Sequence, residues 1–460
     1  MDNFLMLANN ADLSVAMKAF IAAHPEYAEV PLEDWDVSRV EDMSGWFEGC
    51  SSYLLPSLEK WDTSNVKNMS YMFAEFQGGL PDGVKKWDVS NVTNMRGIFA
   101  KSSIKYFWLS EWDTSSVKTM RGAFEFCWKA ESIDIGEWDT SNVTDMSYMF
   151  KGCADVKELD IGEWDVTKVK QMHGMFESCA RLKKMIIPKW SWRSAEDAAY
   201  MFRYCQKLEE VDFGDTVAPK LYDISHMFHG CYFLENLKIN FCAENVIDMS
   251  YTFDHCFWLR RLNISSFKPK KIQDMSHMFS LCENLKRVDL SGFDTSNVTS
   301  MACMFNECHE LEELDLSNFN TGKVTLFNDM FSNCKKLKKL NVSSFNTENV
   351  TNMCCMFKDC RSLAEIDVSK FDTRKVTNFC FAFCDCESLV RLNLGSFYIQ
   401  YGASTLGLCT GCLSLTELIL PQKHPEVYLG SACYEYCNSL PKKYIIWDDE
   451  DDDDYRLFTD

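Results

Sequence analysis

The chain has 460 residues, of which 46% are apolar and 25% are charged, and its formal net charge is −21. This composition is typical of a folded protein. Phosphate binding needs clustered Lys and Arg, so the acidic excess argues against DNA or RNA as a partner. No apolar run approaches the roughly 18 residues of a membrane helix, so no membrane span is expected.

The N-terminal segment differs from everything that follows it. It begins "MDNFLMLANNADLS", with an acidic Asp2 and no basic start or long apolar run, so it does not predict a signal peptide. The following "ADLSVAMKAFIAAH" places Leu13, Met17 and Phe20 on one helical side. We therefore expect residues 1–31 to form a helical cap over the first unit of the rest of the chain.

A fixed period dominates residues 32–441. A Phe recurs at steps of 26 residues, with two steps of 25, and these residues are Phe47, Phe73, Phe99, Phe124, Phe150, Phe176, Phe202, Phe228, Phe253, Phe279, Phe305, Phe331, Phe357 and Phe383. A unit of this size cannot bury its own apolar side, but stacked neighbours make a continuous core. The period predicts one solenoid of about fifteen coils over residues 32–441.

The best-formed repeat is "LKRVDLSGFDTSNVTSMACMFNEC", which starts at Leu285. Its first six residues alternate apolar and polar side chains, which predicts a short strand. The Ser, Thr, Asn and Asp that follow stabilise turns through their short side chains. Met301, Met304 and Phe305 then have the spacing of one helical side. We expect an α/β solenoid, a right-handed coil with parallel strands on one side and short helices on the other.

The repeat resembles a known family. Its elements C-x-x-L-x-x-L-x-L, a turn and M-F-x-x-C are similar to those of the BspA-like leucine-rich repeat surface proteins. The variants "WDVSNVTNM" from Trp87 and "FDTSNVTSM" from Phe293 resemble a branch found in bacterial surface proteins and lipoproteins, protists and large viruses. The resemblance implies a leucine-rich-repeat-like coil and a surface location, and it names no activity. Two early repeats depart from it, because Phe76 and Ser102 replace the Cys.

Two columns of equivalent residues each allow two interpretations. An aromatic precedes each corner, Trp in the first half and Phe in the second, as in Trp138 and Phe293; we expect a buried spine, although an exposed stripe would bind sugars or bases. An Asp follows it, as in Asp139 and Asp294, and could bind calcium or stabilise the corner backbone. Because Asn320 replaces Asp in this column, we favour the corner role.

The 22 cysteines and 8 histidines suggest few chemical sites. Fourteen cysteines follow the repeat, and we expect buried free thiols and therefore a reducing compartment. Cys354, Cys355, Cys380 and Cys384 lie outside that column, which leaves a disulfide, redox or metal role open. The stretch "HMFHGC" from His226, with His255 and His277 on nearby coils, leaves zinc open in the same way.

The outward positions of the strands are the predicted partner-binding surface. Charged residues alternate there in acidic and basic blocks, and the candidates are Glu209, Glu210, Glu235, Arg260, Arg261, Lys286, Arg287, Glu312, Glu313, Lys338 and Lys339. They would form either ion pairs that set the strand register or a mixed-charge surface for a protein. No phosphate loop, nucleophile elbow or paired His/Asp is present, so we predict no catalytic residue, cofactor or metal and no enzyme activity.

These features predict a non-enzymatic protein-interaction or structural scaffold. The partner would be a protein, with a large assembly such as a virion or a surface layer as one setting. The acidic segment "DDEDDDD" lies in the C-terminal tail, residues 442–460, and is expected to be solvated. The absence of a signal peptide favours an intracellular or virion-associated protein. The alternative is a secreted or surface adhesin that binds host protein or carbohydrate.

Overall fold

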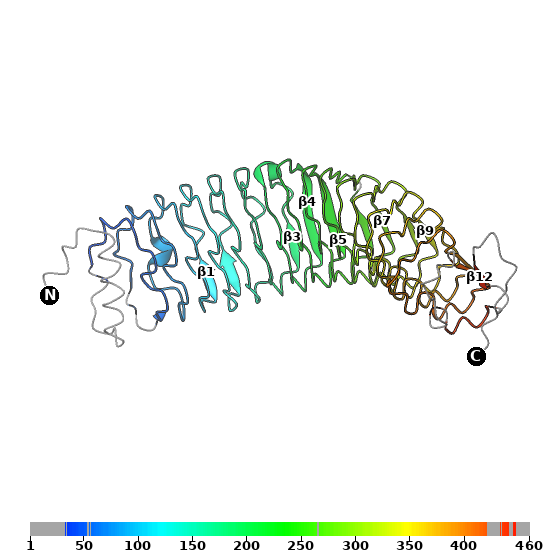
Figure 1. Ribbon diagram of the computed structural model, residues 1–460. Coiled ribbons are helices and arrows are strands. Elements are labelled where there is room, and N and C mark those ends of the chain that lie inside the picture. The colour runs from blue at the N-terminus through cyan, green and yellow to red at the C-terminus, as the bar shows by residue number, and fades with distance from the viewer. Residues whose placement is uncertain are drawn as a thin grey trace. The chain divides into compact units, whose positions relative to one another are not determined.

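The computed structural model describes residues 35–420 except 53, 54, 56 and 265, together with residues 33, 433, 435–440 and 445–447. The expected cap at residues 1–31 lies outside the described residues, as does most of the acidic tail. The chain divides into two compact units, residues 1–241 (unit 1) and 242–460 (unit 2). Within each unit, successive coils lie side by side (Figure 1). The sequence-based division into cap, solenoid and tail stays a prediction.

In the part of unit 1 that the structure describes, five short strands form two sheets. They are β1 (Tyr106–Trp108), β2 (Ser132–Asp134), β3 (Lys184–Ile186), β4 (Glu210–Val217) and β5 (Asn236–Cys242), the last of which ends one residue into unit 2. The sheets are β1-β2 and β3-β4-β5, and the pairings β1–β2 and β3–β4 are parallel.

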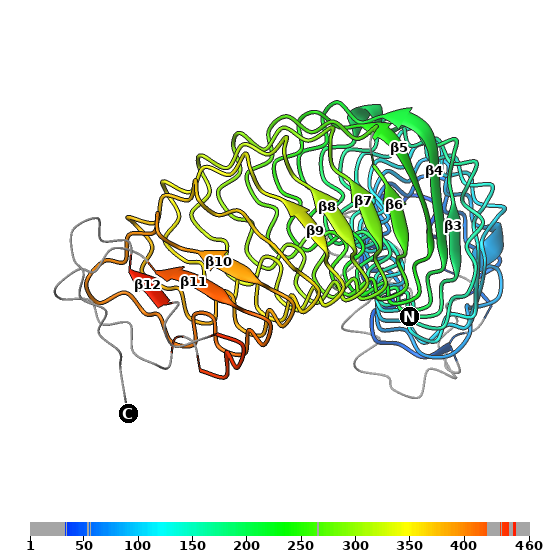
Figure 2. The ribbon, with the colours of Figure 1, turned by 90° about the vertical axis from the view of Figure 1, so that its right-hand side faces the viewer.

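The described residues of unit 2 form seven strands in three sheets. They are β6 (Arg261–Asn263), β7 (Arg287–Asp289), β8 (Glu313–Asp315), β9 (Lys339–Asn341), β10 (Arg391–Asn393), β11 (Glu417–Leu420) and β12 (Ile445–Trp447). The sheets are β6-β7, β8-β9 and β10-β11-β12, with parallel pairing throughout. Strands β6 to β9 follow one another along one side of this stack (Figure 2).

The register confirms a parallel solenoid built on the 26-residue period. Arg261 pairs with Arg287, and Glu313 pairs with Lys339. Directly after the polar corner, isolated parallel bridges repeat from coil to coil. They run from Asp42 to Asp223 in unit 1 and from Asp248 to Ser404 in unit 2. The solenoid has about 12 turns, so the predicted fifteen coils are not supported.

The predicted short helices are wrong. The named helical elements in the described residues are two 3₁₀ turns, η3 (Val84–Lys86) and η4 (Trp192–Ser194), and both lie outside the predicted helical segments. The segment expected to be helical in the best-formed repeat consists of two tight turns, Met301–Met304 and Phe305–Cys308, each closed by an N–H donating to the carbonyl three residues earlier (3.3 and 3.2 Å). The third residue of each turn, Cys303 and Glu307, has a φ of 56° and 62°.

Bonds between coils explain why turns replace helix. An α-helix uses its amides within one segment, from each N–H to the carbonyl four residues earlier. Here alternate amides leave the coil, since Cys303 N–H donates to Asn328 O and Phe305 N–H donates to Met330 O, both at 2.9 Å. These bonds offset the left-handed backbone, which costs roughly 1–2 kcal/mol per non-glycine residue. The spacing of the apolar residues does not distinguish a helix from two tight turns, because both arrangements bury the same side chains.

The polar corner is held by its own side chains. Asp294 Oδ1 accepts the N–H of Ser296 at 3.0 Å, which closes the turn locally. Thr295 Oγ1 donates to Asn320 O in the next coil at 3.0 Å, and Thr299 Oγ1 donates to a carbonyl of the previous coil at 3.1 Å. The predicted corner role of Asp is confirmed at these positions.

Aromatic rings and thiols fill the inside of the coils. The ring of Phe305 stacks between those of Phe279 (5.4 Å) and Phe331 (5.9 Å). The thiol of Cys308 donates to the backbone carbonyl of Phe279 at 3.2 Å and is fully buried. The Trp and Phe spine is also buried, from Trp61 to Trp190 in unit 1 and from Phe267 to Phe397 in unit 2, which confirms that it is core at these positions.

Candidate interaction surface

The strands turn their charged residues to solvent. In β6, Leu262 is buried between exposed Arg261 and Asn263, and β8 repeats this pattern around Leu314. All the predicted surface residues are exposed except Glu210, which is half-buried. Glu209, Glu210 and Glu235 belong to unit 1 and the other candidates belong to unit 2. Their role in binding stays a prediction.

Some of these charges pair between coils. Lys339 Nζ lies 2.8 Å from Glu313 Oε1, and this contact lowers the pKa of the Glu313 carboxyl. In unit 1, Lys184 Nζ lies 2.9 Å from Glu210 Oε2. Opposite charges on neighbouring strands support the register, so these pairs have the structural role considered for the whole surface.

The basic residues of β6 and β7 are arranged differently. Arg261 and Arg287 are register partners, so two like charges lie on adjacent strands. Arg260 and Lys286 precede them on the same two coils, and the Lys286 N–H donates to Arg260 O at 3.0 Å. We call these four exposed residues the basic patch.

An exposed aromatic pair was missed by the sequence analysis. Tyr106 and Trp108 lie on the outward side of β1 and are 47% and 56% exposed, with Phe107 buried between them. Their ring centroids are 6.2 Å apart and their planes differ by 9°. The signal in the sequence was "KYFWLS", in which aromatics occupy outward positions that are polar in the next coil.

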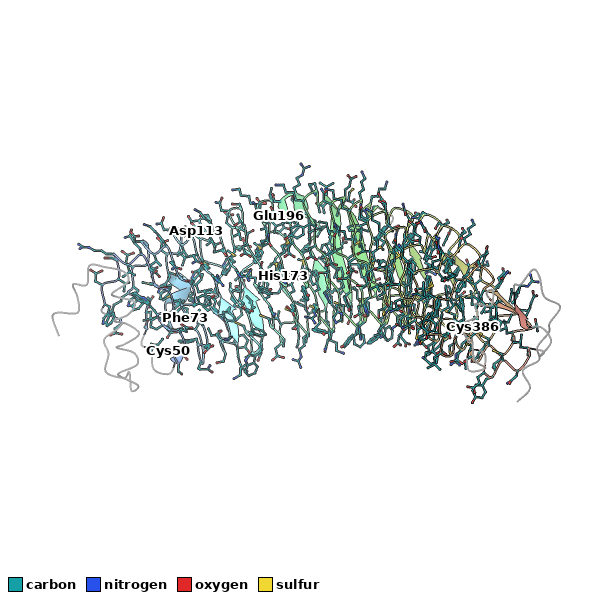
Figure 3. The ribbon with its side chains drawn as sticks, viewed as in Figure 1. Cys50, Phe73, Asp113, His173, Glu196 and Cys386 are labelled. Carbon is teal, nitrogen blue, oxygen red and sulfur yellow. The ribbon has the colours of Figure 1, made fainter. Side chains whose placement is uncertain are left out.

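Hydrogen bonds within the turn account for the Asp residues of this column without calcium. Asp113 accepts the N–H of Ser115 at 3.0 Å, and hydrogen bonds from Ser115 lower the pKa of this carboxyl. Asp113 and Glu196 lie along one edge of unit 1 (Figure 3). The same contact recurs at Asp62 and Asp165.

The histidines considered for zinc lie on the tight turns instead of a helix. The ring of His226 stacks on that of Tyr200, with centroids 4.6 Å apart. His229 Nε2 lies 3.2 Å from the Tyr204 hydroxyl. Both histidines are half-buried and contact aromatic residues of the preceding coil. The rings of both histidines therefore pack against aromatic residues within unit 1.

Four stretches of the chain, residues 15–124, 103–214, 222–339 and 310–404, match the family described as "Mycoplasma protein of unknown function, DUF285". The matches extend over most of the repeat region. The chain belongs to this family. With the 26-residue register, the match makes this DUF285 protein a leucine-rich-repeat-like, BspA-like repeat protein.

Solved structures of leucine-rich repeat proteins resemble the DUF285 chain at low identity. A leucine-rich repeat protein from Bacteroides ovatus is 19% identical, with 65% of this chain and 75% of that one covered and a TM-score of 0.38. One from Eubacterium ventriosum is 17% identical, with 71% and 87% covered and a TM-score of 0.35. A leucine rich cell surface protein from Faecalibacterium prausnitzii is 17% identical, with 58% and 73% covered and a TM-score of 0.25. No curated protein matches the chain.

The thiols of the DUF285 chain fall into two groups. All 22 cysteines are free, and those of the repeat column are mostly fully buried. Burial raises the pKa of the Cys127 thiol to about 12. Outside the column, Cys354 and Cys355 are half-buried with sulfurs 3.5 Å apart, and Cys380 contacts the Ser404 hydroxyl at 2.8 Å. Cys384 is buried, unlike the other three.

The described part of the chain contains no helix with the length and apolar character of a membrane span.

Proposed function

We propose that this DUF285 protein is a non-enzymatic protein-interaction scaffold and that the strand surface of unit 2 binds an acidic region of a partner protein. The basic patch carries this proposal. Like charges on directly opposite strand positions destabilise a sheet, and Arg261 and Arg287 occupy such positions. Their mutual repulsion does not stabilise the coil, whereas a negatively charged partner surface would be attracted to both.

The neighbouring strands provide the contrast. On β8 and β9 the register partners are Glu313 and Lys339, which neutralise each other. One strand surface thus combines a pair of opposite charges that supports the fold with a pair of like charges, Arg261 and Arg287, on directly opposite positions. Complementary charge of this kind speeds association and selects partners.

We also propose a setting for this scaffold. The repeats "WDVSNVTNM" and "FDTSNVTSM" support placing the chain in the BspA-like branch that they resemble. A scaffold of this kind suits a component of a large assembly, such as a virion or a surface layer. The column of buried free thiols favours an intracellular or virion-associated location, because reducing conditions keep thiols free.

The test compares three full-length proteins in affinity capture with chemical cross-linking. The first is the wild type, and the second is the variant Arg261→Glu/Arg287→Glu. The third, Lys323→Glu/Lys375→Glu, changes charge equally at exposed corner residues of the same unit. We expect the wild type and the corner variant to capture the same acidic protein, with cross-links to Lys286, and the patch variant to lose it at least about tenfold. Equal capture by all three proteins would reject the proposal.

A further inference from the structure

The exposed pair on β1 is not required by the solenoid. The register partners of Tyr106 and Trp108 on β2 are Ser132 and Asp134. Those two polar residues flank Ile133, which is buried as Phe107 is, so a polar outward side serves the same coil geometry. Two large aromatic side chains kept in water, where the fold accepts polar ones, indicate a binding role.

Several other exposed rings already carry a cation from this chain. Lys129 Nζ lies 4.6 Å from the ring centroid of Trp128, and Lys207 Nζ lies 4.3 Å from that of Phe233. Tyr71 and Phe126 have similar contacts with Arg96 and Lys151; in this case the cations are 5.9 and 5.7 Å away. Within the described residues, no Lys or Arg lies over the ring of Tyr106 or Trp108.

Lys105, which precedes Tyr106, pairs with a carboxylate of the next coil. Lys105 Nζ lies 3.1 Å from Glu131 Oε1, and the same carboxylate accepts the Tyr106 hydroxyl at 2.8 Å. These contacts lower the pKa of Glu131. Glu131 therefore fixes both Lys105 and the hydroxyl end of Tyr106.

The surroundings attract positive charge. The three consecutive outward segments 105–111, 131–137 and 157–163 hold seven carboxylates and two lysines. Asp134, in the coil next to Trp108, accepts the Ser110 hydroxyl at 3.1 Å and is half-buried. An aromatic ring face carries partial negative charge, so rings within an acidic surface favour a cationic ligand.

We propose that Tyr106 and Trp108 bind an extended segment of a partner protein with Lys or Arg at alternate positions, one cation over each ring. Side chains two residues apart in an extended chain are roughly 6.6 Å apart, and the two ring centroids are 6.2 Å apart. This site rests on the proposed scaffold function but lies on other coils, in unit 1, and selects the opposite charge.

Two fluorescent peptides of identical composition test the spacing. In one, Arg and Ser alternate, and in the other all the Ser residues precede all the Arg residues. Binding to the full-length protein is measured by fluorescence anisotropy at low and high salt. We expect the alternating peptide to bind about tenfold more tightly, which corresponds to about 1.4 kcal/mol and is within reach of two cation–π contacts. Equal affinities would overturn the proposed spacing.

Variants at the pair test the residues themselves. Tyr106→Ser/Trp108→Asn reproduces the polar outward side of β2 without adding charge, and it should bind both peptides equally weakly. Tyr106→Leu/Trp108→Leu keeps an apolar surface but removes the aromatic ring faces, and it should behave in the same way. Trp128→Ser removes an exposed Trp that already has its own lysine, so it should keep the wild-type preference. Unfolding curves would show that the variants are folded.

Two results would reject this site. One is a peptide preference that persists in both pair variants. The other is a neutral oligosaccharide that binds the wild type through Tyr106 and Trp108 while the peptides do not, which would favour the adhesin alternative. The variant Arg261→Glu/Arg287→Glu should keep the peptide preference, so failure here is distinguishable from failure of the scaffold proposal.

Discussion

The two units build the same spine position with different residues. In unit 1 the residue before the corner is Trp from Trp61 to Trp190, and the rings of Trp112 and Trp138 stack at 6.1 Å with planes 5° apart. In unit 2 it is Phe, and the rings of Phe345 and Phe371 stack at 6.5 Å with planes 8° apart. The packing is similar, but the indole N–H has no counterpart in a phenyl ring.

That N–H has a defined partner in unit 1. Trp138 Nε1 donates to the backbone carbonyl of Leu109 in the previous coil at 2.8 Å, and Trp190 Nε1 donates to Ile161 O at 3.0 Å. Each bond is buried and joins the spine of one coil to the strand end of the coil before it. The Trp spine therefore contributes hydrogen bonds as well as apolar packing.

In two coils of unit 2 the residue before the Phe takes over this bond. Asn318, which precedes Phe319, donates its Nδ2 to Leu290 O at 3.2 Å, and Ser344, which precedes Phe345, donates its Oγ to Leu316 O at 3.0 Å. These carbonyls occupy the repeat position that the indoles reach in unit 1. The comparison teaches that this carbonyl can receive a side-chain donor either from the spine or from its neighbour, although Gly292 provides none before Phe293.

The largest effect should be common to both units, because both contain the Phe column. Phe305→Ala in unit 2 and Phe150→Ala in unit 1 each remove a buried ring stacked on both sides, and each should cost about 3–5 kcal/mol in unfolding free energy. Hydrogen exchange should increase first in the adjacent coils, since coupling in a solenoid is between neighbours. A uniform increase along all coils, or a negligible cost in one unit, would contradict this.

The second effect is specific to the Trp spine. Trp138→Phe removes the donor to Leu109 O and some ring volume, and it should cost roughly 2 kcal/mol. Adding Glu137→Asn places the donor where Asn318 has it, and it should restore about 1 kcal/mol. Denaturant unfolding of the single and double variants measures both quantities.

A reciprocal pair controls this experiment. Asn318→Ala should cost about 1 kcal/mol in unit 2, because the Phe spine cannot replace the lost donor. Glu137→Ala should cost almost nothing in unit 1, because Trp138 supplies the donor there. Equal costs for the two alanine variants would show that the carbonyl does not need a side-chain partner.

The sequence predicted the features that repeat. The period determined the parallel stacking, the corner chemistry of Asp294 and Thr295, and the buried columns, because each position recurs in many coils. The turns at Cys303 and Glu307 were missed, since their spacing of apolar neighbours fits a helix equally well and only bonds between coils decide. The pair Tyr106 and Trp108 was missed because it occurs in a single coil.

The thiols should label differently in the two units. The half-exposed cysteines outside the column all lie in unit 2, and they are Cys242, Cys303, Cys354, Cys355 and Cys380. Alkylation of the native protein should therefore modify mainly unit 2, together with half-exposed Cys50 in unit 1. Reaction should be slow at neutral pH, because burial raises the pKa of Cys303 to about 12 and that of Cys50 to about 11.

Denaturation without a reductant provides the control for this labelling. The thiols of the repeat column should then react almost completely, and mass spectrometry can assign each site. Denatured protein that still withholds most of its thiols would mean that the column forms disulfides. The intracellular or virion-associated location proposed for the protein would lose its support.

The smallest effect concerns the Asp column, where unit 2 already contains natural substitutions. Hydrogen bonds from Ser296 lower the pKa of Asp294, so the folded value lies below the unfolded value of about 3.9. Stability from Asp294 is therefore fully present above the unfolded pKa and is lost as the pH falls through the folded pKa.

Asn320 and Asn346 make the same turn contact without a charge, each accepting the N–H two residues later at 3.1 Å. Asp294→Asn should keep the corner and change the melting temperature little at neutral pH, while it reduces the loss of stability below about pH 4. Asp113→Asn in unit 1 should behave alike, since Ser115 makes the same contacts there. Melting curves of both variants at several pH values measure this effect, and an acid dependence equal to that of the wild type would show that these carboxylates add nothing to their turns.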